Sequence, residues 1–514
     1  MNLSCSLSRC LVAPPSLRWL STSTASLPLH HTRLQPSPPS AVPPTTTAAA
    51  SRANDDPRQN SDLREQALLS LFNSCSSTGE LRQIHAQIIR SGFHQHVYLV
   101  GRVVSFCSVS EAGSMDYAAQ VFQGVRWPDG FLWNTMIRGF GRTGRSTEAF
   151  LYYKRMQEQG KPTDNFTFSF LLKICGQLVA PELGKQVHCS AVKRGLDSHV
   201  YVRNTLIHMY AMFGDTTTAH RLFDEMPNRD VVAWNTVIDG YVHCGEHRVA
   251  LDMFLRMHGS GLRPDDATLV VVLSACSELG ALDFGRWVHS LIRGSRFERF
   301  VSVSNSLIDM YAKCGVVDQA LHVFEEMKDR DVVSWNSMIL GLAMHGHAAR
   351  ALQLFARMQE QWGCIEPNDI TFLGVLCACS HGGLVEQGKM FFDCMRRDYH
   401  ITPTIRHYGC MTDLLGRAGL VREAYELIRS MPVECNAVVW RTLMAACRVH
   451  GDLELGERIR RHLLELEPDH SSDYVLLSHM YASAGQWQDM LGVRESMRGR
   501  GVQKPKPGSS LINF

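Results

Sequence analysis

The sequence contains no run of apolar residues long enough to cross a lipid bilayer, and it has almost no net charge. Its 52 Lys and Arg residues are balanced by 50 Asp and Glu residues, which leaves a formal charge of +2 on 514 residues. We therefore expect no membrane association, and bulk charge indicates no nucleic-acid partner, so any basic surface would have to be local. The chain is too long for one compact globule, although 45% hydrophobic residues suffice for a large core.

The 16 Cys residues include no Cys-x-x-Cys pair. That spacing is the usual one for a structural zinc site, so we expect neither a bound metal nor another cofactor. Most of the cysteines lie within apolar, periodic stretches, as Cys175, Cys276 and Cys379 do. They are expected to be small buried residues in a reducing compartment.

Acidic residues are absent from residues 1–54, where Ser, Thr, Pro and Ala predominate and Arg supplies the charge. A basic, Ser-rich and acid-free N-terminus is typical of an organellar targeting segment, so we interpret residues 1–60 as a disordered transit peptide. An ordinary disordered tail is the alternative. Residues 18–21 resemble a mitochondrial processing site, whereas the Pro- and Thr-rich residues 37–47 suit a plastid equally well. The expected location is the mitochondrion or the chloroplast, with the mitochondrion slightly favoured.

The most informative feature that is present is a repeat. The dipeptide Trp-Asn begins at Trp133, Trp234 and Trp335, so each copy lies 101 residues after the previous one. Each block of 101 residues divides into two units of 35 residues and one unit of 31, although the third unit of the first type, 332–368, has 37. Weaker copies of the other two unit types precede and follow the regular blocks, which brings the total to 11 units.

Each unit has the pattern of a helical hairpin. In the unit 130–164, the first helix is predicted by apolar residues with the spacing of one helical face: Trp133, Met136, Ile137 and Phe140. Ser146 is the expected N-cap of a second helix, whose apolar face would comprise Ala149, Phe150, Tyr153 and Met156. Because stacked hairpins bury faces that one hairpin cannot, the predicted fold is all-α, an α-solenoid superhelix of helix-turn-helix hairpins with a concave groove.

Three stretches carry a family resemblance: VVAWNTVI at 231–238, NSLIDMYAKCG at 305–315 and ACSHGGLVEQG at 378–388. With these motifs the chain resembles the plant pentatricopeptide repeat (PPR) family, in the PLS subfamily whose long, standard and short repeats alternate. The resemblance runs from about Glu65 to the C-terminus. Tetratricopeptide repeats have a 34-residue period and a different aromatic signature, so the mixed unit lengths argue against them.

The resemblance also divides the chain into segments. Residues 61–129 correspond to degenerate N-terminal repeats, 130–436 to the regular array, 437–504 to the E1 and E2 extension motifs of the E subclass, and 505–514 to a C-terminal tail. Family members with a deaminase domain, called DYW, carry His-x-Glu followed by Cys-x-x-Cys, where zinc activates water and Glu moves protons. Neither motif occurs here, so we expect that the chain is not itself an enzyme.

In this family one repeat addresses one RNA base through its fifth and its last residue. The resemblance therefore assigns RNA binding to five pairs: Asn134 with Asp164, Asn204 with Asp230, Asn235 with Asp265, Asn305 with Asp331, and Asn336 with Asn368. An Asn amide offers a donor and an acceptor, which suits the Watson–Crick edge of an unstacked uracil or cytosine, and the Asp would orient the amide. The alternative is that these residues only cap helices, for which Asp is well suited and an Asn inside a helix is not.

The residue three positions before each Asn would flank the base, and these residues are Phe131, Tyr201, Val232, Ser302 and Val333; Ser302 departs from the apolar preference. The remaining repeats have pairs that do not match the family's code: Ser169/His199, Val270/Phe300, Leu373/Thr404, Gly101/Asp129 and Gly409/Asn436. Val and Leu cannot hydrogen-bond a base edge, so repeats of the second type are not expected to recognise bases, and contact with protein partners is an alternative use. In the family's register, the target RNA would have pyrimidines about 6, 7, 9, 10 and 12 nucleotides upstream of an edited C.

These observations favour a site-recognition factor for C-to-U editing of organellar RNA. Its partners would be single-stranded, pyrimidine-rich organellar RNA, a DYW-type deaminase that acts in trans, and other organellar editing factors. A factor for RNA splicing, stabilisation or translation is the second possibility, and a protein–protein scaffold is the third.

Overall fold

The computed structural model describes residues 57–360, 365–432 and 434–502, and in these residues it contains 26 α-helices, one 3-10 helix and no strand. The predicted all-α fold of stacked hairpins is therefore confirmed. The chain divides into two compact units, of which one ends at Arg263 and the other begins at Pro264.

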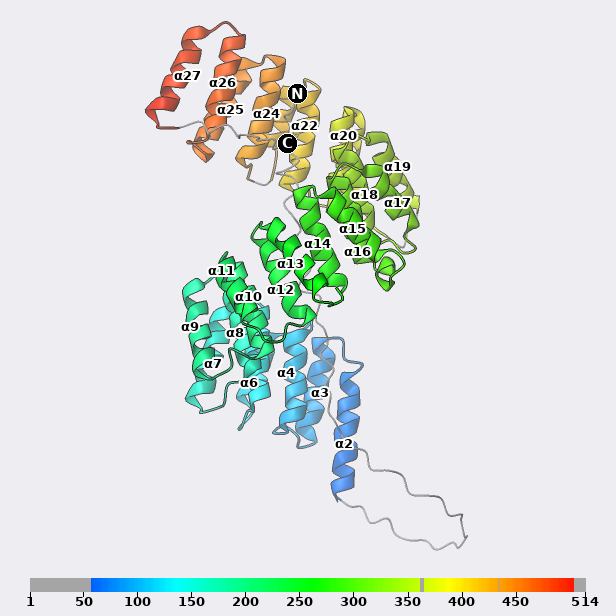
Figure 1. Cartoon of the computed structure of the whole chain (residues 1–514), viewed down its shortest axis with the longest axis vertical. Coiled ribbons are helices and arrows are strands. Elements are labelled where there is room, and N and C mark those ends of the chain that lie inside the picture. The colour runs from blue at the N-terminus through cyan, green and yellow to red at the C-terminus, as the bar shows by residue number, and fades with distance from the viewer. Residues whose placement is uncertain (1–56, 361–364, 433, 503–514) are drawn as a thin grey trace. The chain divides into compact units, whose positions relative to one another are not determined.

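The N-terminal unit is a stack of six helical hairpins (Figure 1). From the second hairpin on, the first helix of each hairpin packs beside the first helix of the next. The hairpins are α2 (Pro57–Phe72) with α3 (Thr78–Arg90), α4 (Val97–Val109) with α5 (Met115–Gln123), α6 (Gly130–Arg142) with α7 (Ser146–Glu158), α8 (Asn165–Leu178) with α9 (Pro181–Lys193), α10 (Val200–Met212) with α11 (Thr216–Asp224), and α12 (Val231–His243) with α13 (His247–Gly259).

The C-terminal unit continues the same architecture with seven hairpins among its described residues. Their first helices again pack side by side, and a short 3-10 helix, η2 (Arg296–Arg299), precedes the second hairpin. The hairpins are α14 (Asp266–Leu279) with α15 (Leu282–Ile292), α16 (Val301–Lys313) with α17 (Val317–Glu326), α18 (Val332–Met344) with α19 (Ala348–Glu360), α20 (Asp369–Gly382) with α21 (Val385–Arg397), α22 (Ile405–Arg417) with α23 (Val421–Arg429), α24 (Ala437–His450) with α25 (Leu453–Leu466), and α26 (Ser471–Ser483) with α27 (Trp487–Gly499).

The hairpin of α6 and α7 shows how local sequence sets the helix ends. Asp129 caps α6, and Gly144 takes a φ of +75° in the turn, which a residue with a side chain rarely adopts. The prediction that Ser146 is the N-cap of α7 is wrong: Arg145 occupies that position, and Ser146 is the first helical residue. Arg145 cannot accept the backbone N–H bonds that a Ser would, but its guanidinium pairs with Glu148 at 2.9 Å in the first turn.

The apolar face of α7 also differs from the prediction at two residues. Phe150 and Tyr153 are only partly buried, whereas Tyr152, about one turn from both Ala149 and Met156, is buried. The Tyr152 ring lies 5.9 Å from the Trp133 ring, edge to face. Trp133 is buried, as predicted, and so are Trp234 and Trp335.

Among the His–Tyr hydrogen bonds of the described residues, two are related by the 101-residue period, one in each unit. Nδ1 of His188 lies 2.9 Å from the hydroxyl of Tyr210, and the same 2.9 Å separates His289 from Tyr311. Burial lowers the pKa of both imidazoles, so they are mainly neutral at pH 7, and the neutral ring can accept from the tyrosine hydroxyl. Each pair ties the second helix of one hairpin to the first helix of the next.

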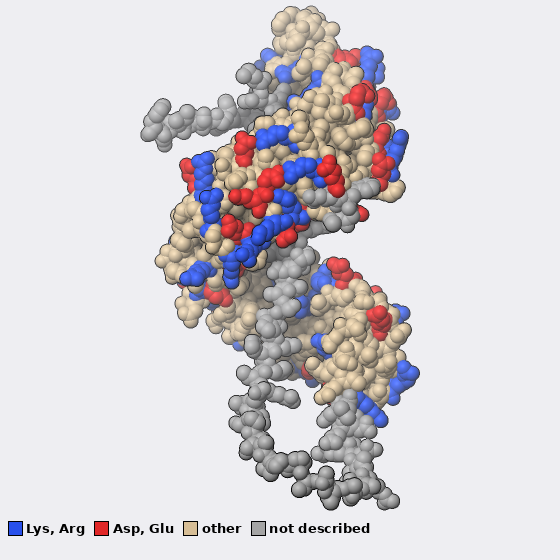
Figure 2. Space-filling view, turned by 90° about the vertical axis from the view of Figure 1, so that its right-hand side faces the viewer, with Lys and Arg blue, Asp and Glu red and all other residues tan. Residues whose placement is uncertain are grey.

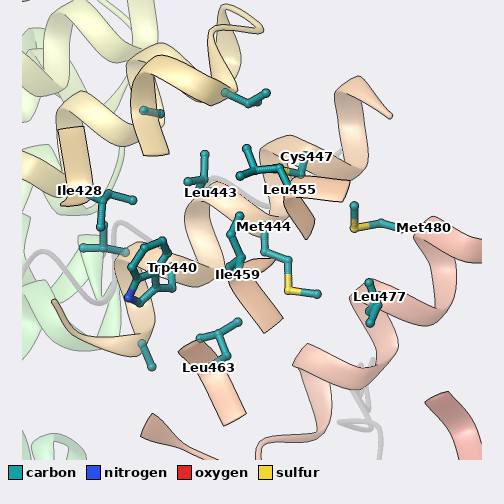
Figure 3. Close-up of a cluster of buried hydrophobic side chains, with 14 of the residues drawn as sticks. Ile428, Trp440, Leu443, Met444, Cys447, Leu455, Ile459, Leu463, Leu477 and Met480 are labelled. Atoms are coloured by element: carbon teal, nitrogen blue, oxygen red, sulfur yellow. The ribbon is translucent and has the colours of Figure 1, made fainter. Parts of the chain in front are cut away.

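The hydrophobic core runs on without interruption from α22 and α23 into α24–α27. Ile428, Trp440, Leu443, Ile459 and Leu477 are members of one buried cluster in this region (Figure 3). The last two hairpins are therefore packed on the repeats as further layers of the same stack.

The surface carries mixed charge. Figure 2 shows Lys and Arg interleaved with Asp and Glu on one face of the molecule. Ion pairs such as Arg350–Asp318, at 3.1 Å, and Arg357–Glu325, at 2.7 Å, join the outer helices α19 and α17. Among the described residues, no helix combines the length and the apolar character that a bilayer span needs. The predicted transit peptide, residues 1–60, lies outside the described residues except for residues 57–60, which belong to α2.

Candidate nucleic-acid interface

The fifth residue of each repeat lies on the first helix of its hairpin, and the last residue lies just before the first helix of the next hairpin. In the repeat that begins with α6, Nδ2 of Asn134 lies 2.9 Å from Oδ1 and 3.2 Å from Oδ2 of Asp164. Because a carboxylate only accepts hydrogen bonds, the amide nitrogen must face it. The Thr167 hydroxyl, which also lies 2.9 Å from Oδ1 of Asp164, donates to Oδ1 of Asn134 over 2.7 Å. The amide of Asn134 is therefore held in a single orientation.

Asn336 on α18 has the same arrangement, with an amide in place of the carboxylate. Its Nδ2 donates to Oδ1 of Asn368 over 3.0 Å, and the Thr371 hydroxyl donates to its Oδ1 over 2.6 Å. Oδ1 of Asn368 also accepts the backbone N–H of Thr371 over 3.1 Å, which identifies it as the acceptor atom. The two repeats lie in different units of the chain and position their Asn side chains in the same way.

The residues that hold the Asn amides also cap helices. Oδ1 of Asp164 accepts both from Asn134 and from the backbone N–H of Thr167, the latter over 2.9 Å, and so caps α8. Asn368 caps α20 in the same manner. Asp164 and Asn368 therefore do both: each caps a helix and each holds the amide of the Asn in the preceding hairpin.

The threonines were not among the residues singled out from the sequence. A signal for them does exist, because Thr or Ser follows three residues after the cap: Thr167, Thr268, Ser334 and Thr371. That spacing is a capping-box pattern.

In the two short repeats of the regular array, the Asn carbonyl oxygen has no hydrogen-bond partner among the residues that the structure describes. Nδ2 of Asn305 donates to Oδ1 of Asp331 over 3.1 Å, but its Oδ1 is buried without a hydrogen-bond partner among the described residues. Oδ1 of Asn204 is also buried without a partner, and no hydrogen bond between described residues joins Asn204 to Asp230. These side chains are only 6% and 8% exposed. A buried acceptor without a donor costs about 1–3 kcal/mol, so both sites favour an incoming N–H donor.

The pair Asn235 and Asp265 falls on the boundary between the two units. Asn235 lies on α12 and is partly buried. Asp265 caps α14 in the C-terminal unit, where its Oδ1 accepts the backbone N–H of Thr268 over 2.8 Å. Asn235 and Asp265 therefore belong to different units of the chain.

The flanking residues differ in exposure between the two units. Phe131, Tyr201 and Val232 are all more than half exposed although they are apolar or aromatic. Ser302 and Val333, in the C-terminal unit, are partly buried. Exposed apolar side chains beside a row of oriented amides can pack against the face of a planar base.

The remaining fifth residues offer a base edge neither an amide nor a free hydroxyl hydrogen. The Ser169 hydroxyl donates to the backbone carbonyl of Asn165 over 2.8 Å. Val270 and Leu373 have apolar side chains. Gly101 has no side chain, and the Phe131 ring lies close to it: a Cβ added at Gly101 would be 3.3 Å from the ring.

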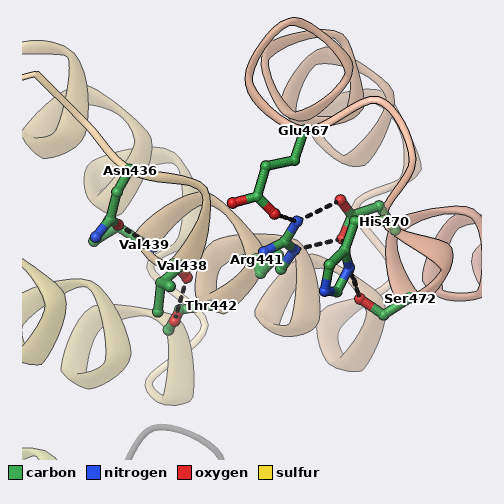
Figure 4. A network of polar contacts seen from close by, with 9 residues as sticks. Asn436, Val438, Val439, Arg441, Thr442, Glu467, His470 and Ser472 are labelled. Carbon is green, nitrogen blue, oxygen red and sulfur yellow. Dashed lines mark hydrogen bonds and ion pairs between the residues drawn. The ribbon is translucent and has the colours of Figure 1, made fainter. Parts of the chain in front are cut away.

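The hairpins after the repeats are joined by an ionic network (Figure 4). Nε of Arg441 on α24 lies 2.7 Å from Oδ1 of Asp473 on α26, and Glu467 in the connection pairs with the same guanidinium. Asp473 is buried, and its charge is met by Arg441; Nδ1 of His470 lies 3.6 Å from its Oδ1. Breaking such a pair leaves a buried charge without a partner, so the network fixes how α26 packs on α24.

Among the described residues, no group of three or more His, Cys, Asp and Glu side chains is arranged to hold a metal ion. His381 and Cys379, two positions apart in the ACSHGG motif, have other surroundings. His381 Nδ1 lies 2.7 Å from the backbone carbonyl of Ala343. Cys379 is buried, which raises the pKa of its thiol to about 11.

Sequence comparison matches the chain to three family models. The PPR repeat family matches residues 128–177, 229–278 and 330–381, the PPR repeat matches residues 201–231, 302–332 and 406–435, and the E motif matches residues 450–513. The first set covers the Trp-Asn repeats, and the second covers the short repeats that contain Asn204, Asn305 and Gly409.

Similar proteins cover most of the chain. A pentatricopeptide repeat-containing protein of Arabidopsis thaliana, named as chloroplastic/mitochondrial, is 42% identical over 465 residues, which cover 87% of this chain and 72% of the relative. Another from the same plant is 37% identical over 480 residues, which cover 87% of this chain and 89% of the relative. The crystal structure of the pentatricopeptide repeat protein PPR10 from maize aligns with a TM-score of 0.56 at 17% identity, over 87% of this chain and 71% of that one. At that identity the structural likeness supports the fold alone.

Proposed function

Because the chain belongs to the pentatricopeptide repeat family, with the alternating repeats of the PLS subfamily and an E motif, we propose that it binds a specific single-stranded RNA in an organelle. In this proposal it is a site-recognition factor for C-to-U RNA editing. It is not itself an enzyme and recruits a deaminase in trans. The organellar location is supported by the acid-free N-terminus and by relatives whose names include chloroplastic or mitochondrial.

One observation carries the RNA-binding part of the proposal: the buried carbonyl oxygens of Asn204 and Asn305 have no donor within the described protein. The two residues are 101 positions apart, so the same unpaired acceptor occurs at the same point of two equivalent repeats. The N3–H group of uracil is a donor of the required kind. Both oxygens are closed off from solvent, so a base that satisfies them requires neighbouring side chains to move aside on binding.

The paired amides fit the same partner. In Asn134, one hydrogen of Nδ2 is directed to Asp164, and one lone pair of Oδ1 accepts from Thr167. One donor hydrogen and one acceptor lone pair remain on the amide. Uracil presents O4 as an acceptor beside N3–H as a donor, so it can use both. Cytosine presents a different order of donor and acceptor, which a fixed amide distinguishes from uracil.

The proposed recruitment surface is the stack of hairpins α24–α27. The exposed side chains of Trp487 and Leu491 lie one turn apart on α27, the last described helix. Exposed apolar residues in such a group support contact with a protein partner. The E motif match covers this region, which favours editing over the other RNA-processing roles.

Sequencing of organellar transcripts from a plant line that lacks the protein tests the proposed role. Loss of conversion at one C, with that C lying downstream of a matching pyrimidine pattern, is expected. Intact editing together with an unspliced or missing transcript would replace editing with the second function. Intact editing and normal transcripts would favour the alternative that the protein is a protein–protein scaffold. The repeated Asn pairs argue against that alternative.

A further inference from the structure

The connection between α15 and α16 carries a group of arginines without acidic partners. Arg293, Arg296 and Arg299 lie within seven residues of one another, and all three are exposed. No ion pair joins any of them to a carboxylate in the part of the chain that the structure describes. Arg293 is the C-cap of α15, where a cation favours the helix end, whereas the other two lie beyond that helix, in η2.

The one acidic residue of η2 is used by the backbone. Oε2 of Glu298 accepts the backbone N–H of Gly294 over 3.2 Å. The Ser295 hydroxyl accepts the backbone N–H of Phe297 over 3.2 Å and so caps η2, and the N–H of Phe300 donates to the Phe297 carbonyl over 3.0 Å. These bonds fix the connection and leave its arginines without a neutralising carboxylate.

Arg296 and Arg299 lie on the same side of η2. Residues three apart are eclipsed on a 3-10 helix and are separated by about 6 Å along its axis, at about 2 Å per residue. The Arg296 guanidinium lies 4.9 Å from the centroid of the Phe297 ring. A guanidinium that packs its face on a ring keeps its N–H groups, which lie in its plane, free for an oxyanion.

Arginines in two other connections between hairpins are engaged by the protein itself. Nε of Arg330 donates to the backbone carbonyl of Phe324 over 2.9 Å, and Arg229 makes the equivalent bond at the end of α11 over 3.1 Å. Both therefore stabilise helix ends. Arg296 and Arg299 make no such bond to the described residues, so their donors are available to a partner.

The connection leads directly into a helix that carries a candidate base-binding residue. α16 begins at Val301, two residues after Arg299, and Asn305 lies about one turn further on. The repeat that contains the arginines, 266–300, has Val270 at its fifth position, which cannot hydrogen-bond a base. The phosphates of an RNA strand held at Asn305 are the anions that the proposed function brings nearest to this connection.

We propose that Arg296 and Arg299 bind neighbouring phosphates of the RNA strand, so that the repeat 266–300 adds affinity without recognising a base. A guanidinium can donate two N–H groups to one phosphate. The inference rests on the proposed function, because the strand must already lie along α16. The equivalent connection of the repeat 165–199 has no such role, since its Asp197 lies 3.4 Å from the guanidinium of Arg203.

The test is equilibrium binding of the full chain to a 16-nucleotide RNA, followed by fluorescence anisotropy at several salt concentrations. The RNA carries uracil at the five predicted pyrimidine positions and adenine elsewhere. The double variant Arg296→Gln/Arg299→Gln should bind about tenfold or more weakly, as for lost charged hydrogen bonds. The slope of log affinity against log salt should become shallower by about 1.4, at about 0.7 for each phosphate of a single strand.

Two further variants separate this site from a general effect of charge. Arg350→Gln/Arg422→Gln removes two exposed cations from the outer helices α19 and α23 and should keep the affinity and the slope. Arg296→Lys/Arg299→Lys keeps both charges and should restore the salt slope, although a Lys cannot make the paired contact.

Uncharged methylphosphonate linkages identify the phosphates. Placed on both sides of the nucleotide about 8 positions upstream of the edited C, they should weaken binding of the parent protein. They should cost little more in Arg296→Gln/Arg299→Gln, because the same contacts are already lost. The same linkages at the 5′ end of the RNA are the control and should have little effect.

Normal affinity and salt slope in Arg296→Gln/Arg299→Gln would overturn the inference, and so would losses that add to those of the methylphosphonates. Normal RNA binding together with lost editing in a plant line that carries this variant would assign the arginines to an acidic protein partner instead. The preference for pyrimidines at the five predicted positions stays normal in all of these outcomes. If the parent protein lacks that preference, the proposed function fails together with the inference.

Discussion

The amide nitrogen of Asn134 donates to the carboxylate of Asp164, 2.9 Å away and 30 residues further along the chain. The same carboxylate oxygen caps α8 through the backbone N–H of Thr167. The geometry of the candidate base-binding amide is therefore tied to the start of the next hairpin. A change in hairpin stacking would move the Asn134 amide and the start of α8 together. A regular row of amides therefore requires a regular stack of hairpins.

Thr167→Val tests the threonine contact. The substitution keeps the shape of the side chain but removes the hydroxyl that donates to Asn134 over 2.7 Å. The amide can then rotate, so the preference for uracil over cytosine about 12 nucleotides upstream should be lost, while the other positions keep theirs. The free energy of unfolding should fall by about 1–2 kcal/mol, because the same hydroxyl also accepts the backbone N–H of Asp164 over 3.1 Å.

Anisotropy with RNAs that differ only at that nucleotide measures the loss of preference. Thr236→Val is the control, because the Thr236 hydroxyl donates to Val232 within its own helix, over 2.7 Å. An unchanged preference in Thr167→Val would show that Asp164 alone orients the amide.

Asn305→Thr, with Asp331 kept, tests the assignment of one repeat to one base. By analogy with the family, the preference should move towards G at a single nucleotide, about 7 positions upstream. The variant should fold normally, because in the described protein the Asn305 side chain loses only the hydrogen bond of Nδ2 to Asp331, and a Thr hydroxyl can also donate. Selection of bound sequences from an RNA pool randomised at each position measures the outcome, and a change spread over several positions would contradict the assignment.

Much of the fold and part of the candidate site could be predicted from the sequence. The Trp-Asn period fixed the hairpin units, and the burial of Trp133, Trp234 and Trp335 follows from their place on apolar helical faces. The contact of Thr167 with Asn134 could not be predicted in the same way, because 33 residues separate them and the pattern around Thr167 is that of an ordinary cap.

Other details depend on contacts that a local pattern does not contain. Ser146 is a good capping residue by type, but the chain places Arg145 at the cap, where Arg145 also pairs with Asp116 of the preceding hairpin at 2.6 Å. The ring stack of Phe166 with Tyr201 joins side chains of two repeats. It becomes visible only when α8 and α10 lie side by side.

Stability should depend on pH through His407, which is buried on α22. Its Nε2 donates to the backbone carbonyl of Asp369 over 2.8 Å, and its Nδ1 accepts from the backbone N–H of Thr404 over 3.0 Å. Burial lowers the pKa of this imidazole. Below about pH 6.5 the unfolded chain takes up a proton that the folded chain does not, so stability falls as the pH drops, by up to about 1.4 kcal/mol per pH unit.

His407→Gln isolates this contribution. Gln at this position can complete a capping box with Thr404 and does not titrate. The other histidines remain in both proteins, so the difference between variant and parent reports His407 alone. Guanidinium denaturation at pH 7.5, 6.5 and 5.5 should show a shallower loss of stability in the variant, and parallel curves would contradict the prediction.

Trp335 tests the packing of the hairpins. Its indole is fully buried against Phe324, with ring centroids 5.0 Å apart, and its Nε1–H has no partner among the described residues. Trp335→Ala should lower the free energy of unfolding by about 3–5 kcal/mol. Trp335→Phe should cost less than about 2 kcal/mol, because it removes an unpaired buried donor together with part of the ring. The exposed Trp487, changed to Phe, should be nearly neutral, and equal losses for Trp335→Phe and Trp335→Ala would refute this account of the packing.

The central claim is that the Asn residues at the fifth positions recognise pyrimidines. A gel shift with the full chain compares an RNA that has pyrimidines about 6, 7, 9, 10 and 12 nucleotides upstream of the edited C with the same RNA carrying purines there. The account predicts that the purine RNA binds at least about 100-fold more weakly, since each lost base contact costs about 1 kcal/mol. Undiminished affinity for the purine RNA would contradict it.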